Sequence, residues 1–375
     1  MSNRRHILNA DAFDQLFDAL RDAGYTTVGP TLHDGAIVYD ALTCAADLPV
    51  GWIDVQEAGR YAVQDTGSGR YFDYTVGPHT WKRFLRPPRE PLFEAIRSGA
   101  GVAFHAAAAP EETYALMGVR ACDLAALGVL DAVLTGQTYV DTRYATRRSR
   151  AFVVAVQCAR AGNTCFCVSM NTGPRASAGF DLALTELKDA GRHVFVVEVG
   201  SPRGATIAAA LGLRDSTEED WAAARAVSAA TAANMGRQLD TTGLVSLLQQ
   251  EAENPLWNDI AQRCLACANC TMVCPTCFCT TVEIDSDLEQ TRASHTQVSD
   301  SCFHASFTQM HGGPPVRDTT SARYRQWLTH KLSTWHDQFG HSGCVGCGRC
   351  VTWCPVGIDL TAEAARLRAS HEERA

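Results

Sequence analysis

The sequence predicts an α+β protein: a mixed α/β domain over residues 1–215, followed by an α-helical domain over residues 254–375. Two observations support this fold class. Continuous apolar runs typical of buried strands alternate with amphipathic segments in the first part. Helical spacing dominates the last part, where it surrounds two copies of one cysteine motif.

The first domain begins with helical spacing of apolar residues over 8–24, where Asp11 is a plausible N-cap and Gly24 a plausible end. Residues 25–90 contain short apolar runs between Gly and Asp, which is typical of a sheet-rich region. Residues 114–120 then predict a strand, and residues 122–134 predict a helix.

Two further apolar runs, AFVVAVQC (151–158) and HVFVVEVG (193–200), predict buried strands. The segment ALTELKDAG (183–191) between them is interpreted as helical. Residues 216–253 are Ala-rich and predict a helical connector to the last domain. In that domain, RYRQWLTHKLSTWHDQF (323–339) has the spacing of a long helix, and the terminal residues from 360 predict an exposed charged helix.

Four cysteines occur twice in the arrangement C-x2-C-x2-C-x3-C-P, and the second copy follows the first at a constant interval. This run is the signature of bacterial ferredoxins, in which the fourth cysteine binds the other [4Fe-4S] cluster. The predicted ligands of the first cluster are Cys264, Cys267, Cys270 and Cys354. Those of the second cluster are Cys344, Cys347, Cys350 and Cys274. The long interval between the copies favours a helical dicluster ferredoxin domain.

Structural zinc is the alternative for a cysteine quartet. Zinc sites are normally built from two C-x2-C pairs. A triplet closed by C-x3-C-P, present in two copies, favours iron–sulfur clusters instead. Clusters that exchange ligands must be neighbours, so this domain is expected to conduct single electrons.

Four cysteines of the first domain are candidates for a third [4Fe-4S] cluster. Cys122 lies at a strand-to-helix turn, Cys158 ends an apolar run, and Cys165 and Cys167 lie in a loop. Strand ends and loops are places where ligands converge in an α/β sheet. The alternative is that Cys122 and Cys158 are simply buried small apolar residues. The Cys-Phe-Cys pair weakens that alternative, because both thiols of such a pair do not fit an ordinary core arrangement.

A similar loop follows the first cysteine run. It contains Cys277 and Cys279, and Cys302 is a candidate companion. These three thiols predict either an additional metal site or a set of thiols that line the cluster pocket. Cys44 is isolated and is expected to be inert.

Composition excludes several classes of function. The net charge of −8 argues against a nucleic-acid partner, and the basic stretch from Arg317 to Lys331 is interpreted as solvated or salt-bridged surface. No apolar run approaches the roughly 18 residues of a membrane span, and the first residues do not form a signal peptide. Sixteen cysteines without an export signal indicate metal ligands in a reducing cytoplasm.

Several motifs in the same order resemble one family. They are GVRACDLAALGVLD (118–131), DTRYATRR (141–148), NTCFCVSMNTGP (163–174), GFDLALTEL (179–187), CPTCFC (274–279), DSCFHASFTQMHGG (300–313) and residues 323–360. The chain resembles the beta subunit of cytoplasmic sulfhydrogenases, the NADP-linked [NiFe] hydrogenases, and is similarly close to the electron-transfer subunit of anaerobic sulfite reductase. Asn171 and Met310-His311-Gly312 depart from the family pattern without touching a proposed ligand.

The resemblance implies a non-catalytic relay. Its partners would be a flavoprotein subunit with FAD that handles NAD(P)H, and the small and large subunits of a [NiFe] hydrogenase. The absence of a dinucleotide fingerprint and of a Walker loop agrees with this role. Three alternatives stay open: an electron-transfer protein of a sulfite reductase, a redox-sensing iron–sulfur protein, and an enzyme with an open iron at Cys277, Cys279 and Cys302.

Overall fold

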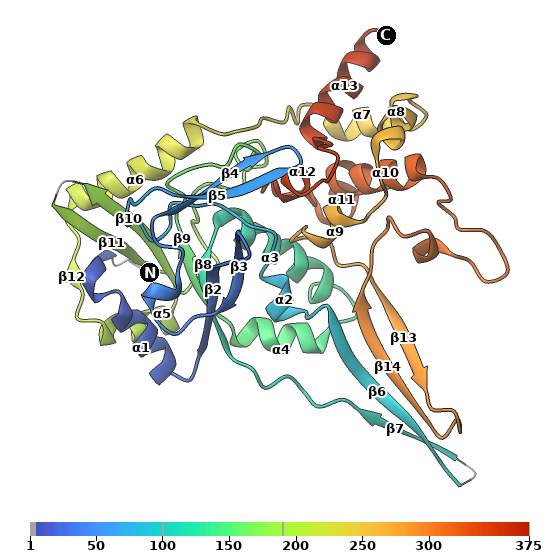
Figure 1. The fold of residues 1–375 in the computed structure, drawn as a ribbon, viewed down its shortest axis with the longest axis horizontal. Coiled ribbons are helices and arrows are strands. Elements are labelled where there is room, and N and C mark those ends of the chain that lie inside the picture. Colours follow the sequence, from blue (N-terminus) through green and yellow to red (C-terminus); the bar gives the residue numbers. More distant parts are fainter. Residues whose placement is uncertain (1–4, 100, 190, 375) are drawn as a thin grey trace.

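The computed structural model describes residues 5–99, 101–189 and 191–374 (Figure 1). The strands are β1 (Arg5–Asn9), β2 (Thr26–His33), β3 (Ala36–Ala41), β4 (Trp52–Glu57), β5 (Arg60–Asp65), β6 (Arg89–Ser98), β7 (Gly101–Ala106), β8 (Tyr114–Val119), β9 (Phe152–Val156), β10 (Leu182–Asp189), β11 (Arg192–Val199), β12 (Arg214–Asp215), β13 (Thr280–Ser286) and β14 (Arg292–Ser299). The α-helices are α1 (Asp14–Asp22), α2 (Lys82–Leu85), α3 (Ala121–Leu134), α4 (Thr142–Arg150), α5 (Pro202–Ala210), α6 (Glu218–Ala233), α7 (Leu244–Gln250), α8 (Leu256–Arg263), α9 (Asn269–Met272), α10 (Thr320–Thr329), α11 (Trp335–Phe339), α12 (Arg349–Thr352) and α13 (Leu360–Glu372). Short 3-10 turns are η1 (Ala10–Ala12), η2 (Ala45–Asp47) and η3 (Ala305–Thr308), and η4 (His330–Thr334) is a π-helical turn.

An eight-stranded mixed sheet forms the centre of the amino-terminal part, in the order β12-β1-β11-β10-β9-β8-β2-β3. Its middle strands β10, β9, β8 and β2 are parallel, and the outer pairs are antiparallel. Helices α1 and α5 pack on one face, whereas α3, α4 and α6 pack on the other. The sheet is therefore buried on both faces, which explains the continuous apolar runs of β8, β9 and β11.

The prediction of a helix at residues 183–191 is wrong, because residues 183–189 lie in β10, and residue 190 is outside the described residues. Six consecutive residues from Leu182 are buried, since β10 lies between β9 and β11 with helices on both sides. Glu186 is buried and accepts hydrogen bonds from the backbone N–H groups of Tyr71 (2.9 Å) and Phe72 (3.0 Å). Tertiary contacts thus overrode the local helical tendency.

The helices of the carboxyl-terminal part pack around a second core that includes Trp257, Tyr324 and Trp327. The predicted long helix is present as α10, the π-helical turn η4 and α11 in succession. Helix α13 is less exposed than expected, because Leu360, Ala364 and Leu367 contact this core. The two cysteine runs carry equivalent short helices, α9 and α12, which contact each other.

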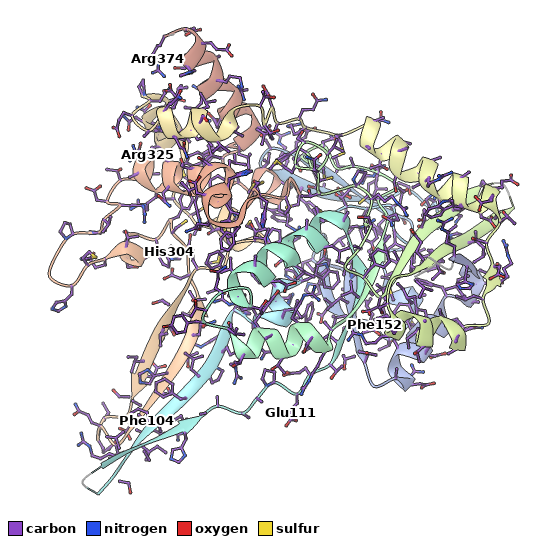
Figure 2. All side chains as sticks on the ribbon, turned by 180° about the vertical axis from the view of Figure 1, so that it is seen from behind. Phe104, Glu111, Phe152, His304, Arg325 and Arg374 are labelled. Atoms are coloured by element: carbon purple, nitrogen blue, oxygen red, sulfur yellow. The ribbon has the colours of Figure 1, made fainter. Side chains whose placement is uncertain are left out.

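A four-stranded antiparallel sheet, β13-β14-β6-β7, projects from the molecule as an arm (Figure 1). It joins strands from both predicted domains, with β14 paired to β6. At its far end Phe104 is 70% exposed (Figure 2). The carboxyl-terminal part therefore contains a β-hairpin in addition to the predicted helices.

Among the helices in the described part of the chain, none has the length and apolar character that crossing a membrane requires.

Candidate functional site

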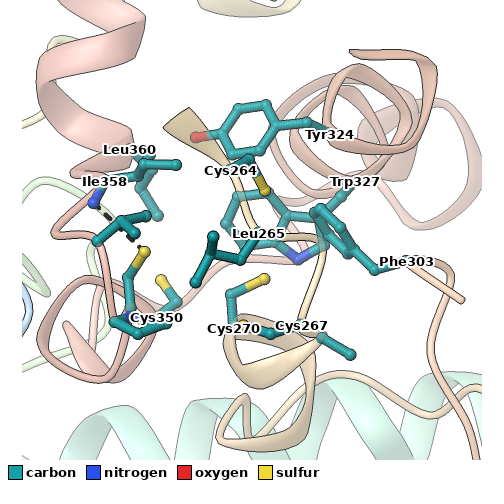
Figure 3. Close-up of a pocket in the computed structure, with 14 residues that line it drawn as sticks. Cys264, Leu265, Cys267, Cys270, Phe303, Tyr324, Trp327, Cys350, Ile358 and Leu360 are labelled. Carbon is teal, nitrogen blue, oxygen red and sulfur yellow. Dashed lines mark hydrogen bonds between the residues drawn. The ribbon is translucent and has the colours of Figure 1, made fainter. Parts of the chain in front are cut away.

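The first group of predicted ligands lines one cavity. Cys264 follows α8, Cys270 lies in α9, and Cys267 lies in the loop between them, whereas Cys354 arrives from the end of α12. The structure brings these four thiols to the same cavity, which Cys350 also lines, and the crossed ligand assignment stays a prediction. Figure 3 shows the thiols facing a wall of aromatic and aliphatic side chains, which includes Phe303, Tyr324, Trp327, Leu265 and Ile358.

Backbone donors reach two of these sulfur atoms. The N–H of Ala266 lies 3.4 Å from Sγ of Cys264, and the N–H of Ile358 lies 3.3 Å from Sγ of Cys354. Ala266 reaches this position with a left-handed backbone (φ 49°). Such N–H donors favour a thiolate, which is the form that binds iron.

The second group of predicted ligands lines a neighbouring cavity. Cys274 comes from the first run, and Cys344, Cys347 and Cys350 come from the second. Lys331 is buried beside them, with Nζ 3.3 Å from Sγ of Cys274. A hydrogen bond from the thiol of Cys277, together with the Lys331 ammonium, holds the pKa of the Cys274 thiol well below its usual value.

The third group of predicted ligands also lines one cavity. Cys122 lies in the first turn of α3, just beyond β8, and Cys158 lies two residues beyond β9. These are the carboxyl ends of adjacent parallel strands, where ligands were expected to converge. Cys165 and Cys167 complete the group from the loop that follows. Burial raises the pKa of the Cys122 and Cys165 thiols well above the usual value.

The three cavities form a row. Cys350 lines both the first and the second cavity, and Cys347 lines both the second and the third. The loop of the third group packs directly on the second cysteine run, where the N–H of Phe166 donates to the carbonyl of Gly346 over 2.8 Å. Sγ of Cys165 lies 3.8 Å from the carbonyl oxygen of Cys347. The second group therefore lies between the other two.

The three additional cysteines do not line these cavities as one group. Cys277 hydrogen-bonds Cys274, and Cys279 hydrogen-bonds Cys302, which lowers the pKa of Cys279 to about 7. In the described part of the chain no three His, Cys, Asp or Glu side chains converge tightly enough for a single metal ion. A cubane needs wider spacing, because each thiolate binds a different iron. The additional site at Cys277, Cys279 and Cys302 stays a prediction.

Three buried cations near the cysteines, Arg120, Lys331 and Arg349, were missed by the sequence reasoning. Lys331 is only 7% exposed, so its assignment to a solvated or salt-bridged surface is wrong. The sequence feature that could have indicated its burial is the interval of four residues to Trp327 and to Trp335, which places all three residues on one buried helical face. Arg120 lies two residues before Cys122 and lines the third cavity. The sequence feature that could have identified Arg120 is its position at the predicted junction of strand and helix.

Comparison with known proteins defines the class. Residues 263–358 match the family model described as the 4Fe-4S dicluster domain, so the chain is an iron–sulfur protein that carries [4Fe-4S] clusters and transfers electrons. Over 354 residues the chain is 28% identical to sulfhydrogenase 2 subunit beta of Pyrococcus furiosus. The alignment covers 94% of this chain and 95% of that protein, and it confirms the predicted resemblance. No solved structure matches.

Proposed function

We propose that the chain is the electron-transfer subunit of a cytoplasmic [NiFe] hydrogenase complex. It would relay single electrons between a flavoprotein subunit, which holds FAD and handles NAD(P)H, and the small and large hydrogenase subunits. The near full-length likeness to a sulfhydrogenase beta subunit supports this assignment. [4Fe-4S] clusters supply one-electron chemistry when bound, and the chain itself would contribute no catalytic residue.

Three clusters are proposed, each held by one quartet of cysteines. The donor sets fit, because all four cysteines of each quartet line one cavity. The first set is Cys264, Cys267, Cys270 and Cys354; the second is Cys274, Cys344, Cys347 and Cys350; the third is Cys122, Cys158, Cys165 and Cys167. The amino-terminal domain (1–215) would hold the third set, the connector (216–253) would link the domains, and residues 254–375 would hold the other two.

The observation that carries the proposal is the row of cavities with a shared cysteine at each junction. Neighbouring clusters would be close enough for direct electron hopping. The ends of the row differ in exposure. Cys267 at the first cavity is exposed, whereas at the third Cys122, Cys165 and Cys167 are buried and Cys158 is partly buried. The first cavity thus offers the more accessible end for exchange with a partner.

Iron analysis of variants tests the cluster count. The wild-type protein should contain about twelve irons, four in each cluster. Cys122→Ser should lose about four of them and keep the two EPR signals of the dicluster domain. Cys44→Ser is the matched control and should keep full iron content, because Cys44 lies outside all three quartets. Full iron content in Cys122→Ser would disprove the third ligand set.

Purification of the complex tests the partners. Co-purification with a flavoprotein and with nickel-containing subunits is the expected result. A sirohaem spectrum in the complex would favour a sulfite reductase instead. Clusters that the flavoprotein cannot reduce at catalytic rates would favour a redox sensor.

A further inference from the structure

The third cavity contains a buried arginine without a carboxylate partner among the described residues. Arg120 is the N-cap residue of α3 and is 2% exposed. Its Nη2 donates to the carbonyl oxygens of Phe72 (3.2 Å) and Tyr74 (2.7 Å). Its Nη1 is buried and has no hydrogen-bond partner among the residues that the structure describes. The guanidinium is thus held by two carbonyl groups that do not neutralise its charge.

The other charges around this cavity neutralise one another. Arg160 lies 2.8 Å from a carboxylate oxygen of Asp54. Asp123, next to Cys122, lies 2.9 Å from the guanidinium of Arg349. Arg120 lines this cavity together with the four thiols and therefore supplies the net positive charge that faces them.

A buried charge is strongly unfavourable unless an opposite charge accompanies it. An arginine remains protonated in proteins, so the cavity requires an anion. A [4Fe-4S] cluster with four thiolates is negatively charged, and it becomes more negative on reduction. A nearby fixed cation therefore stabilises the reduced form more than the oxidised form.

The three cavities differ in the charged side chains that lie near their thiols. The described residues that line the first cavity include no Lys, Arg, Asp or Glu, and its wall is aromatic and aliphatic. Lys331 lies at the second and donates to Cys274 and to Thr276 (3.0 Å). Arg120, itself buried, lines the third cavity.

We propose that the positive charge of Arg120 raises the reduction potential of the cluster in the third cavity above that of the cluster in the first. Electrons would then accumulate at the third-cavity end of the row. This inference rests on the proposed function, because it requires the third cluster to be present.

EPR-monitored redox titration of the purified protein tests the inference. The third cluster is identified as the signal absent from Cys122→Ser. In Arg120→Gln the ratio of reduced to oxidised third cluster at a fixed potential should fall about tenfold or more, which corresponds to about 59 mV for a one-electron couple. Arg120→Lys keeps the charge and should retain a potential close to that of the wild type. Arg97→Gln removes an exposed charge on β6 and is the control.

Each outcome decides the inference. A shift below about twofold in Arg120→Gln with full iron content overturns it, as does an equal loss of potential in Arg120→Lys. If neither variant holds the third cluster, the wild-type protein decides: a third cluster that titrates below the first overturns the inference. A wild-type protein with only two clusters instead overturns the third ligand set, before any Arg120 variant is measured.

Discussion

At the residue scale, the two cysteine runs use different residues at equivalent backbone positions. Ala266 and Ala268 in the first run have left-handed φ values of 49° and 66°, and Gly346 and Gly348 in the second have 63° and 79°. The second run requires glycine for a further reason. A Cβ at Gly346 would lie 2.6 Å from the carbonyl oxygen of Phe166, because the loop of the third group packs there. Only one run has to accommodate that loop.

The substitutions Ala266→Gly and Gly346→Ala should therefore change the free energy of unfolding in opposite directions. Ala266→Gly removes the Cβ conflict of a left-handed residue and should raise the free energy of unfolding by about 1 kcal/mol. Gly346→Ala places a Cβ on a left-handed residue and in close contact with Phe166. It should lower the free energy of unfolding by more than about 2 kcal/mol. The measurement is thermal unfolding, followed with the release of iron.

The control is Ala365→Gly, at an exposed position inside α13. There glycine should be destabilising by about 1 kcal/mol. Equal effects of Ala266→Gly and Ala365→Gly would show that the left-handed conformation of Ala266 carries no strain.

At the element scale, the arm is fixed to the body where β6 begins. Glu90 is 4% exposed, and one of its oxygens lies 2.6 Å from Nε of Arg143 and 2.7 Å from Nη2 of Arg147, both on α4. Burial acts to raise the pKa of Glu90, but the two guanidinium groups outweigh it, and the pKa is lower than usual. This triad couples the arm to the helix that covers the central sheet.

Glu90→Gln should lower the free energy of unfolding at pH 7 by about 1.5–3 kcal/mol, because charged hydrogen bonds are lost inside the protein. Since the folded pKa lies below the unfolded value of about 4.3, the contribution of Glu90 is present above that pH and disappears as the pH falls through the folded pKa. The variant and the wild type should therefore converge in acid. Denaturant unfolding at a series of pH values measures this.

Glu94→Gln is the matched control on the same strand. Its ion pair with Arg292 is exposed, so the loss should be about 0–1 kcal/mol. A loss in Glu94→Gln as large as that in Glu90→Gln would contradict the role of burial.

The elements also show what the sequence could and could not predict. The strands β8 and β9 and the helix α3 were predictable, because their apolar runs are continuous or periodic. β10 was not, since Leu182–Asp189 mixes apolar and polar residues and its buried Glu186 is satisfied by a distant loop. The arm was also not predictable, because β6 and β14 lie far apart in the sequence and only the fold pairs them. Local patterns contain no information on such pairing.

At the scale of the whole molecule, the motifs predicted three groups of thiols but not their order in space. The spacing within each run defines which cysteines are close to one another. The adjacency of the third group to the second depends on the packing of Phe166 against Gly346, which joins the two parts of the chain. Arg120 and Lys331 were missed for the same reason, since burial of a cation depends on the assembled fold.

The order of the groups also predicts the order in which iron is lost. Cys267 and the neighbouring Leu265 of the first cavity are exposed, whereas in the third group Cys122, Cys165 and Cys167 are buried and Cys158 is partly buried. A chelator with a mild oxidant should therefore remove the cluster of the first cavity before that of the third, because access to the iron limits the reaction. Time-resolved EPR of samples reduced after each interval measures the order, with the signal missing in Cys122→Ser as the marker of the third cluster. The same order should persist in Cys44→Ser, whose substitution touches no cavity. Loss of the third signal first would contradict the order of exposure and would place the accessible end of the row at the amino-terminal part of the molecule.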